Sequence, residues 1–154
     1  MAYDFINLTI AEKVADLTLI RSPGNLLHIP MMEEINDAML SLRRYDSLQV
    51  LLVRGGKEDF SLGLDLEEHV PSRVRRLLQV FMRMFENIRM MNVISIAAVE
   101  GRAHGAGFEL ALGCNLIVAA DSAEFSLPQL HDGLIPPVAT AVLPRIAPRR
   151  KAME

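Results

Sequence analysis

The sequence has one cysteine, no tryptophan and no long apolar run free of charges. The lone Cys114 has no intramolecular disulfide partner, a pattern typical of reducing compartments, so we expect a cytoplasmic protein. The N-terminus has no basic region followed by an apolar core, and we expect neither a signal peptide nor a membrane partner. The four histidines, His28, His69, His104 and His131, lack ligand-like spacing, so we expect no metal.

An excess of basic charge is also lacking. The 16 Lys and Arg residues are outnumbered by 19 Asp and Glu residues, and the pI is near 5.8. General nucleic-acid binding usually requires a clustered basic excess, so we expect no nucleic-acid partner. The 154 residues, 51% of them hydrophobic, are enough for one domain. The basic segment 144–154 stops without a helix cap, and we expect the natural domain to continue beyond it.

Apolar periodicity predicts an α/β domain with helices packed on a sheet. Charged residues between the first two runs favour a hairpin of edge strands, and glycine-bearing loops or turns separate several of the later elements. The expected strands are 5–10, 14–20, 48–53, 93–99 and 116–120, and the expected helices are 31–45, about 71–90 and one beginning near residue 106.

The most informative stretch is 95–114, where an apolar strand runs into a glycine-rich turn and then a helix of small residues. Glu109 sits in the first turn of that helix among apolar neighbours, and an ionised Glu is rarely buried without a partner. Gly105 and Gly107 let the backbone approach a ligand, and a helix's first turn leaves N–H groups unpaired. A second loop, around Gly63 and Leu64, also carries a glycine.

Two such loops, each aiming one N–H into a shared cavity, would form an oxyanion hole. The alternative is that the glycines only make tight turns and that Glu109 is salt-bridged or caps a helix. No Gly-x-Ser-x-Gly elbow is present, and Gly105-Ala-Gly107 lacks the full spacing of a dinucleotide fingerprint. Spacing alone leaves both interpretations open.

Residues 60–66, 97–112 and 121–129 together resemble the crotonase, or enoyl-CoA hydratase/isomerase, family. The resemblance implies an α/β crotonase-like (ClpP/crotonase) spiral of repeated ββα units. Residues 1–154 would form its core domain, without the C-terminal helices that in the family close the acyl site and build a trimer. A homotrimer or hexamer acting in fatty or aromatic acid metabolism is the corresponding expectation.

The resemblance also implies roles for individual residues. The backbone N–H groups of Leu64 and Ala106 would hold the thioester oxygen of an acyl-CoA, and Glu109 would activate water. No separate cofactor is expected, because coenzyme A is part of the substrate. Asp65 is also expected to cap the helix that follows it. Further expected substrate-binding positions are Arg21, Asn25, Leu26, Leu62, Gly63, Asp65 and Gly105.

One position departs from the family pattern: Gln129 stands where hydratases carry a second catalytic glutamate. An amide can position water or substrate but cannot exchange a proton at neutral pH. His131 or Asp132 could take over, although a surface or packing role is favoured for both. Three hypotheses follow: hydration of an enoyl-CoA or dienoyl-CoA, double-bond isomerisation by Glu109 alone, or non-catalytic CoA binding. Residues 136–145 resemble the branch that hydrates cyclic dienoyl-CoA thioesters.

Overall fold

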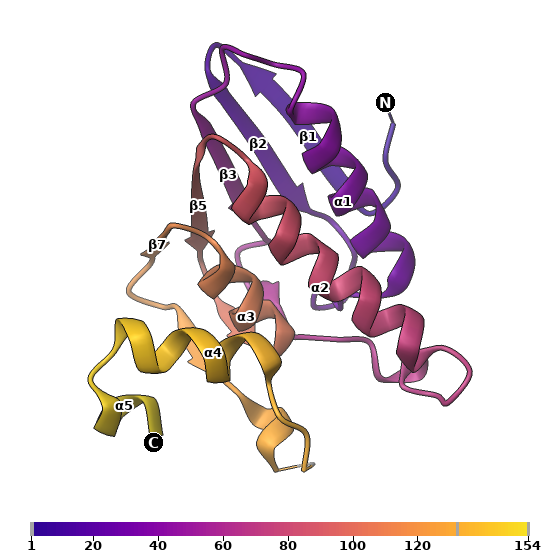
Figure 1. Ribbon diagram of the computed structural model, residues 1–154, viewed down its shortest axis with the longest axis vertical. Helices are drawn as coiled ribbons and strands as arrows, with labels where there is room; N and C mark the ends of the chain where they lie inside the picture. The colour runs from indigo at the N-terminus through magenta and orange to yellow at the C-terminus, as the bar shows by residue number, and fades with distance from the viewer. Residues whose placement is uncertain (1, 132, 154) are drawn as a thin grey trace.

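The computed structural model describes residues 2–131 and 133–153. Its largest feature is a five-stranded sheet of order β1-β2-β3-β5-β7, in which β1 is antiparallel to β2 and all other pairs are parallel (Figure 1). Its strands are β1 (Ile6–Ala11), β2 (Val14–Leu19), β3 (Val50–Arg54), β5 (Ile94–Val99) and β7 (Leu116–Ala119). The hairpin is as predicted, but β2 is an interior strand because it also pairs with β3.

A second, smaller sheet was not recognised in the residue pattern. Its three parallel strands are β4 (Asp59–Ser61), β6 (Arg102–His104) and β8 (Glu124–Ser126), in the order β4-β6-β8. The residue pattern predicts loops and turns for these segments. Three residues are too few for an alternating pattern to emerge, and the strands form because parallel neighbours supply their hydrogen bonds.

Helices α1 and α2 lie side by side across one face of the large sheet (Figure 1). The helices are α1 (Ile29–Leu42), α2 (Val74–Met90), α3 (Ala106–Gly113), α4 (Pro137–Ile146) and α5 (Arg149–Met153), with 3-10 turns η1 (Leu66–Glu68) and η2 (Pro128–Leu130). Leu17, Leu51, Met39 and Phe81 are fully or almost fully buried in the core that these layers enclose. Among the described residues, no helix is long and apolar enough to cross a membrane.

The chain repeats one unit three times after the hairpin and α1. Each unit adds a strand to the large sheet, then a short strand to the small sheet, and then a helix: β3-β4-α2, β5-β6-α3 and β7-β8-α4. The expected spiral of ββα units is therefore confirmed. Because the small sheet is parallel, the loops that follow β4, β6 and β8 all leave from the same edge.

Candidate active site

Three loops meet at the carboxyl edge of the small sheet. The loop after β4 contains Leu64, the turn after β6 contains Gly105, and the turn after β8 contains Gln129. The N–H of Gly105 donates to the Ser126 carbonyl at 2.8 Å, which ties the second turn to the third. Residues far apart in the chain thus come together because their strands are neighbours.

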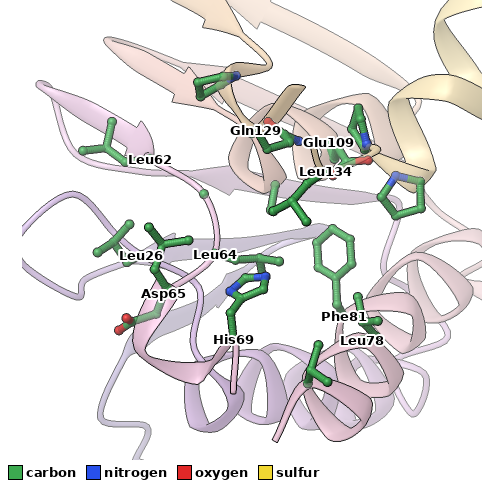
Figure 2. Close-up of a pocket in the computed structure, with 18 of the residues that line it drawn as sticks. Leu26, Leu62, Leu64, Asp65, His69, Leu78, Phe81, Glu109, Gln129 and Leu134 are labelled. Atoms are coloured by element: carbon green, nitrogen blue, oxygen red, sulfur yellow. The ribbon is translucent and has the colours of Figure 1, made fainter. Parts of the chain in front are cut away.

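A cavity of about 510 Å³ opens among these loops, α2 and the segment before α4 (Figure 2). This volume lies within the roughly 300–1,000 Å³ typical of small-molecule sites. Most of the wall is apolar. The lining residues include Leu26, Leu62, Gly63, Leu64, Asp65, Leu66, Glu67, His69, Val74, Leu78, Phe81, Gly105, Ala106, Glu109, Pro128, Gln129, Leu134, Ile135, Pro136 and Pro137.

Two residues that line this cavity have backbone N–H groups without a partner among the described residues. Among the described residues, neither Leu64 N–H nor Ala106 N–H donates to a protein acceptor. The two loops touch: a Cβ placed on Gly63 would lie 3.2 Å from the His104 carbonyl oxygen and 3.5 Å from the Ala106 nitrogen. Gly63 has φ +110°, a conformation that residues with a side chain rarely adopt. Two residues with unpaired N–H groups thus lie on touching loops of the cavity wall.

Glu109 is 2% exposed and lies in the first turn of α3. Its Oε1 accepts hydrogen bonds from the backbone N–H groups of Val138 at 2.6 Å and Ala139 at 3.0 Å. These donors belong to the first turn of α4, where unpaired N–H groups favour an anion. The partner that this buried carboxylate requires is thus a helix N-terminus almost thirty residues later in the sequence.

Burial of the Glu109 carboxylate raises its pKa above the ordinary value, because the charged form loses its hydration. The hydrogen bonds from Ala139 and Val138 oppose this effect by stabilising the charged form. Burial is the larger of the two effects. A carboxylate with a raised pKa is a stronger base than an exposed one, which suits it to accept a proton.

Gln129 packs against Gly105, where an added Cβ would lie 3.1 Å from the Gln129 Oε1. That oxygen is buried, and it has no hydrogen-bond partner among the described residues. Gln129 is a residue of the cavity wall whose amide can form hydrogen bonds but cannot exchange a proton at neutral pH.

Two of the expected substrate-binding residues, Arg21 and Asn25, do not line the cavity. The Arg21 guanidinium donates to the Leu26 carbonyl at 2.8 Å and to Asp65 Oδ2 at 2.7 Å. Asn25 is buried, and its Nδ2 donates to the carbonyls of Asp59 and Phe60. Arg21 thus ties the early loop to the loop that carries Leu64, and Asn25 ties it to strand β4.

The remaining expectations are met to different degrees. Asp65 caps η1, since its side chain accepts from the Glu67 N–H, which confirms the expected capping role. Its carboxylate is directed away from the cavity (Figure 2). His131 is exposed and does not line the cavity, and Asp132 lies outside the described residues.

Sequence reasoning missed several cavity residues. Phe81 lies in the helix that apolar periodicity predicts over about residues 71–90, but the pattern does not indicate that it reaches a ligand site. His69 was considered only as a metal ligand, and Leu134 and Pro136 were not considered as cavity wall. Local spacing carries no signal for these residues, because their distance from Glu109 is set by the packing of different repeats.

The fold is a spiral of ββα units with a cavity at the ends of its short strands, and a comparison of the sequence with known families agrees with it. A sequence profile described as enoyl-CoA hydratase/isomerase matches residues 9–154. The chain belongs to the enoyl-CoA hydratase/isomerase, or crotonase, family.

Curated relatives agree with this assignment. A probable enoyl-CoA hydratase of Bacillus subtilis (strain 168) is 31% identical over 154 residues, covering 97% of this chain and 60% of the relative. The carnitinyl-CoA dehydratase of Escherichia coli (strain K12) is 31% identical over 155 residues, covering 93% of this chain and 56% of the relative. The chain thus spans somewhat more than half the length of these relatives.

Solved structures share the fold. Pseudomonas aeruginosa DspI superposes with a TM-score of 0.93 at 28% identity, over 99% of this chain and 60% of that one. An enoyl-CoA hydratase/carnitine racemase from Magnetospirillum magneticum gives a TM-score of 0.90 at 27% identity, over 99% of this chain and 60% of that chain.

Proposed function

We propose that this chain carries the core of an enzyme that hydrates the double bond of an enoyl-CoA or dienoyl-CoA. The observation that carries the proposal is one buried carboxylate, Glu109, lining the same apolar cavity as the unpaired N–H groups of Leu64 and Ala106. A thioester oxygen that receives both N–H donors is polarised, and negative charge that develops on it during attack at the β-carbon is stabilised.

The proposed reaction begins with the Glu109 carboxylate taking a proton from water while the water oxygen bonds to the β-carbon. The electron pair of the double bond moves onto the thioester oxygen, which gives an enolate. The enolate then collapses, and its α-carbon takes the proton back from the Glu109 carboxyl group. Since Gln129 cannot supply that proton, one carboxyl group serves both steps, and Gln129, which also lines the cavity, positions the water or the substrate.

Double-bond isomerisation is the second candidate, and Gln129 is the observation that favours it. Moving a double bond along the acyl chain needs one group that removes a proton from one carbon and returns it to another. Glu109 alone meets that requirement. No water has to be held, so a second carboxylate is unnecessary.

Further features of the whole protein belong to the same proposal. We propose that the reaction uses no cofactor beyond the CoA of its substrate, and that the protein is a cytoplasmic homotrimer or hexamer. Leu116 and Val118 on the edge strand β7 are 54% and 61% exposed, an apolar surface that assembly would bury. Size-exclusion chromatography with light scattering tests the oligomeric state.

A substrate panel tests the reaction. The purified protein is offered a 2-enoyl-CoA, a 3-enoyl-CoA and a cyclic dienoyl-CoA, and the products are followed by mass. We expect gain of one water by a conjugated thioester. A shifted double bond without a mass change would support isomerisation instead. No change in any thioester, with CoA binding retained, would support a non-catalytic role.

The pH dependence of turnover is a further prediction. The base must be ionised, so kcat falls as the pH is lowered through the raised pKa of Glu109. We therefore expect the acid limb at a pH above the ordinary glutamate value of about 4.3. Glu109→Gln is the control. Any pH dependence that arises from ionisation of the substrate is also present in the residual activity of this variant. An acid limb that is unchanged in Glu109→Gln would assign it to another group.

A further inference from the structure

The early loop, residues 20–28, connects β2 to α1 and runs beside the loop that carries Leu64. The N–H of Leu27 donates to the Gly63 carbonyl at 2.8 Å, and the Leu27 carbonyl accepts from the Asp65 N–H at 3.0 Å. Leu27 and Leu64 are thus paired as in a parallel sheet, where one residue bonds to the two neighbours of its partner. The early loop therefore holds the residues on both sides of Leu64 and leaves the Leu64 N–H unpaired.

One side chain of the early loop reinforces this pairing. The Arg21 guanidinium donates to the Leu26 carbonyl of its own loop and, at 2.7 Å, to Oδ2 of Asp65, the residue directly after Leu64. The other oxygen of Asp65 accepts from the Glu67 N–H at 3.1 Å, so both carboxylate oxygens are engaged. The side chains of Arg21 and Asp65 are 25% and 12% exposed, and a partly buried ion pair is screened less than a surface pair.

The position of this ion pair suits it to fix the conformation of the loop. Gly63, directly before Leu64, has φ +110°, and glycine can adopt many backbone conformations, so contacts from outside the loop are needed to hold the Leu64 N–H in one orientation. A donor to a developing oxyanion is effective only when it is held in place before the reaction. Arg21 does not line the cavity, and the Asp65 carboxylate is directed away from it (Figure 2).

We propose that Arg21 is a positioning residue, which acts through its ion pair with Asp65 to hold the Leu64 N–H where it can receive the thioester oxygen. This inference rests on the proposed function for the role of that N–H. Arg21 itself does not touch the substrate, and it moves no proton.

Arg21→Met tests the inference by activity, because methionine keeps an unbranched side chain but lacks both donors. We expect kcat for the best enoyl-CoA to fall by roughly 10–100-fold, the order of effect of a slightly misplaced catalytic group, while the Kd for CoA itself is unchanged. Arg21→Lys keeps the charge without the fork of donors and is expected to restore part of kcat.

Asp65→Asn tests the other half of the ion pair. Asparagine can still accept from the Glu67 N–H, so the cap of η1 is retained while the charge that Arg21 meets is lost. We expect a loss of kcat similar to that of Arg21→Met, and little further loss when the two changes are combined, because the pair is then already broken. Independent, additive losses would overturn the inference.

The carbonyl stretch of a bound thioester gives a readout that does not depend on turnover. The ligand is hexanoyl-CoA with a ¹³C-labelled thioester carbonyl, which has no double bond to react, and the band is followed by infrared difference spectroscopy. Hydrogen bonds to the carbonyl polarise it and lower its frequency. We expect a lowered frequency in the wild type and a smaller shift in Arg21→Met. A variant that is folded but merely less stable would keep the wild-type band.

Arg54→Met is the matched control. Arg54 pairs with Asp16 at 2.9 Å and joins β3 to β2, and neither residue lines the cavity. We expect the kcat and the carbonyl band of the wild type. Urea unfolding shows which variants are folded, and Arg21→Lys and Asp65→Asn supply the comparison if Arg21→Met is not. Equal losses of kcat in Arg21→Met and Arg54→Met would overturn the inference.

The two measurements separate this inference from the proposed function. A band shift that shrinks in Arg21→Met supports the inference even if no thioester is hydrated. Turnover by the wild type with the same band in both proteins supports the proposed function and rejects the inference. A Kd for CoA raised tenfold or more in Arg21→Met, with the wild-type band, would assign Arg21 to substrate binding and also overturn the inference.

Discussion

Glu109→Gln is expected to lower kcat by roughly 10²–10⁴-fold, the usual contribution of a general base, while leaving the Kd for a saturated acyl-CoA nearly unchanged. The glutamine oxygen can still accept from the N–H groups of Val138 and Ala139, so the contact between α3 and α4 is retained. What the variant lacks is a group that takes a proton from water. Stopped-flow or steady-state turnover of the best enoyl-CoA, with calorimetry for binding, measures both quantities.

The stability of Glu109→Gln follows from the same pKa. The pKa of Glu109 is higher in the folded state than in the unfolded state, so folding favours the protonated carboxyl group. This contribution to stability is complete at a pH below the unfolded-state pKa. It is lost as the pH rises through the folded-state pKa. At neutral pH the wild type therefore carries the cost of a buried charge. We expect the free energy of unfolding of Glu109→Gln at pH 7 to equal or exceed that of the wild type, and the difference to shrink toward acid pH.

Glu109→Leu is the contrasting control. It also lacks a base, but it leaves the N–H groups of Val138 and Ala139 without their acceptor, at a cost of about 1–3 kcal/mol for each unpaired buried group. Urea unfolding should show this loss in Glu109→Leu only. Turnover by Glu109→Gln within about tenfold of the wild type would remove Glu109 from the proposed mechanism.

Gly63→Ala is expected to lower kcat/KM by roughly 10²–10³-fold, the usual effect of losing one oxyanion donor. The added Cβ would lie 3.2 Å from the His104 carbonyl oxygen, which must shift by a few tenths of an ångström, and Gly63 has a φ of +110°, where a side chain is strained. In the proposed mechanism, the shift disturbs the placement of the Leu64 and Ala106 N–H groups around the thioester oxygen. Turnover is compared with the Kd for a saturated acyl-CoA.

Gly133→Ala is the matched control for Gly63→Ala. Gly133 also has a positive φ, +72° against +110° for Gly63, but a Cβ there meets nothing within 4 Å. This variant also places a side chain at a positive φ but does not crowd the two loops, and we expect activity close to that of the wild type. Equal losses in the two variants would attribute the effect of Gly63→Ala to strain alone.

Much of the large sheet was predictable because its strands are apolar runs of four or more residues. The stripe of apolar residues in α2 was recognisable for the same reason, although the helix begins at Val74 and not near residue 71. Helix α1 was shifted in the prediction: it spans Ile29–Leu42, and residues 31–45 were expected. Helix ends depend on caps and tertiary contacts more than on periodicity.

The candidate site was only half predictable. A carboxylate among apolar residues at Glu109 is an anomaly that the sequence shows directly, and so are the glycines of two loops and the amide at Gln129. The orientation of Arg21 and Asn25 into the protein was not foreseen, because their partners Asp65 and Phe60 lie 44 and 35 residues further along the chain. No local pattern encodes such pairs.

By itself, the sequence determined the order of the main elements, the family resemblance and the residue types available for chemistry. Only the tertiary structure decided which of them meet. The pairing of three very short parallel strands brings Leu64, Ala106 and Gln129 to one edge, and the α4 N-terminus supplies the partner of Glu109. Periodicity reports how each segment is buried, whereas the site depends on pairing between segments, which is set by the packing of the whole chain.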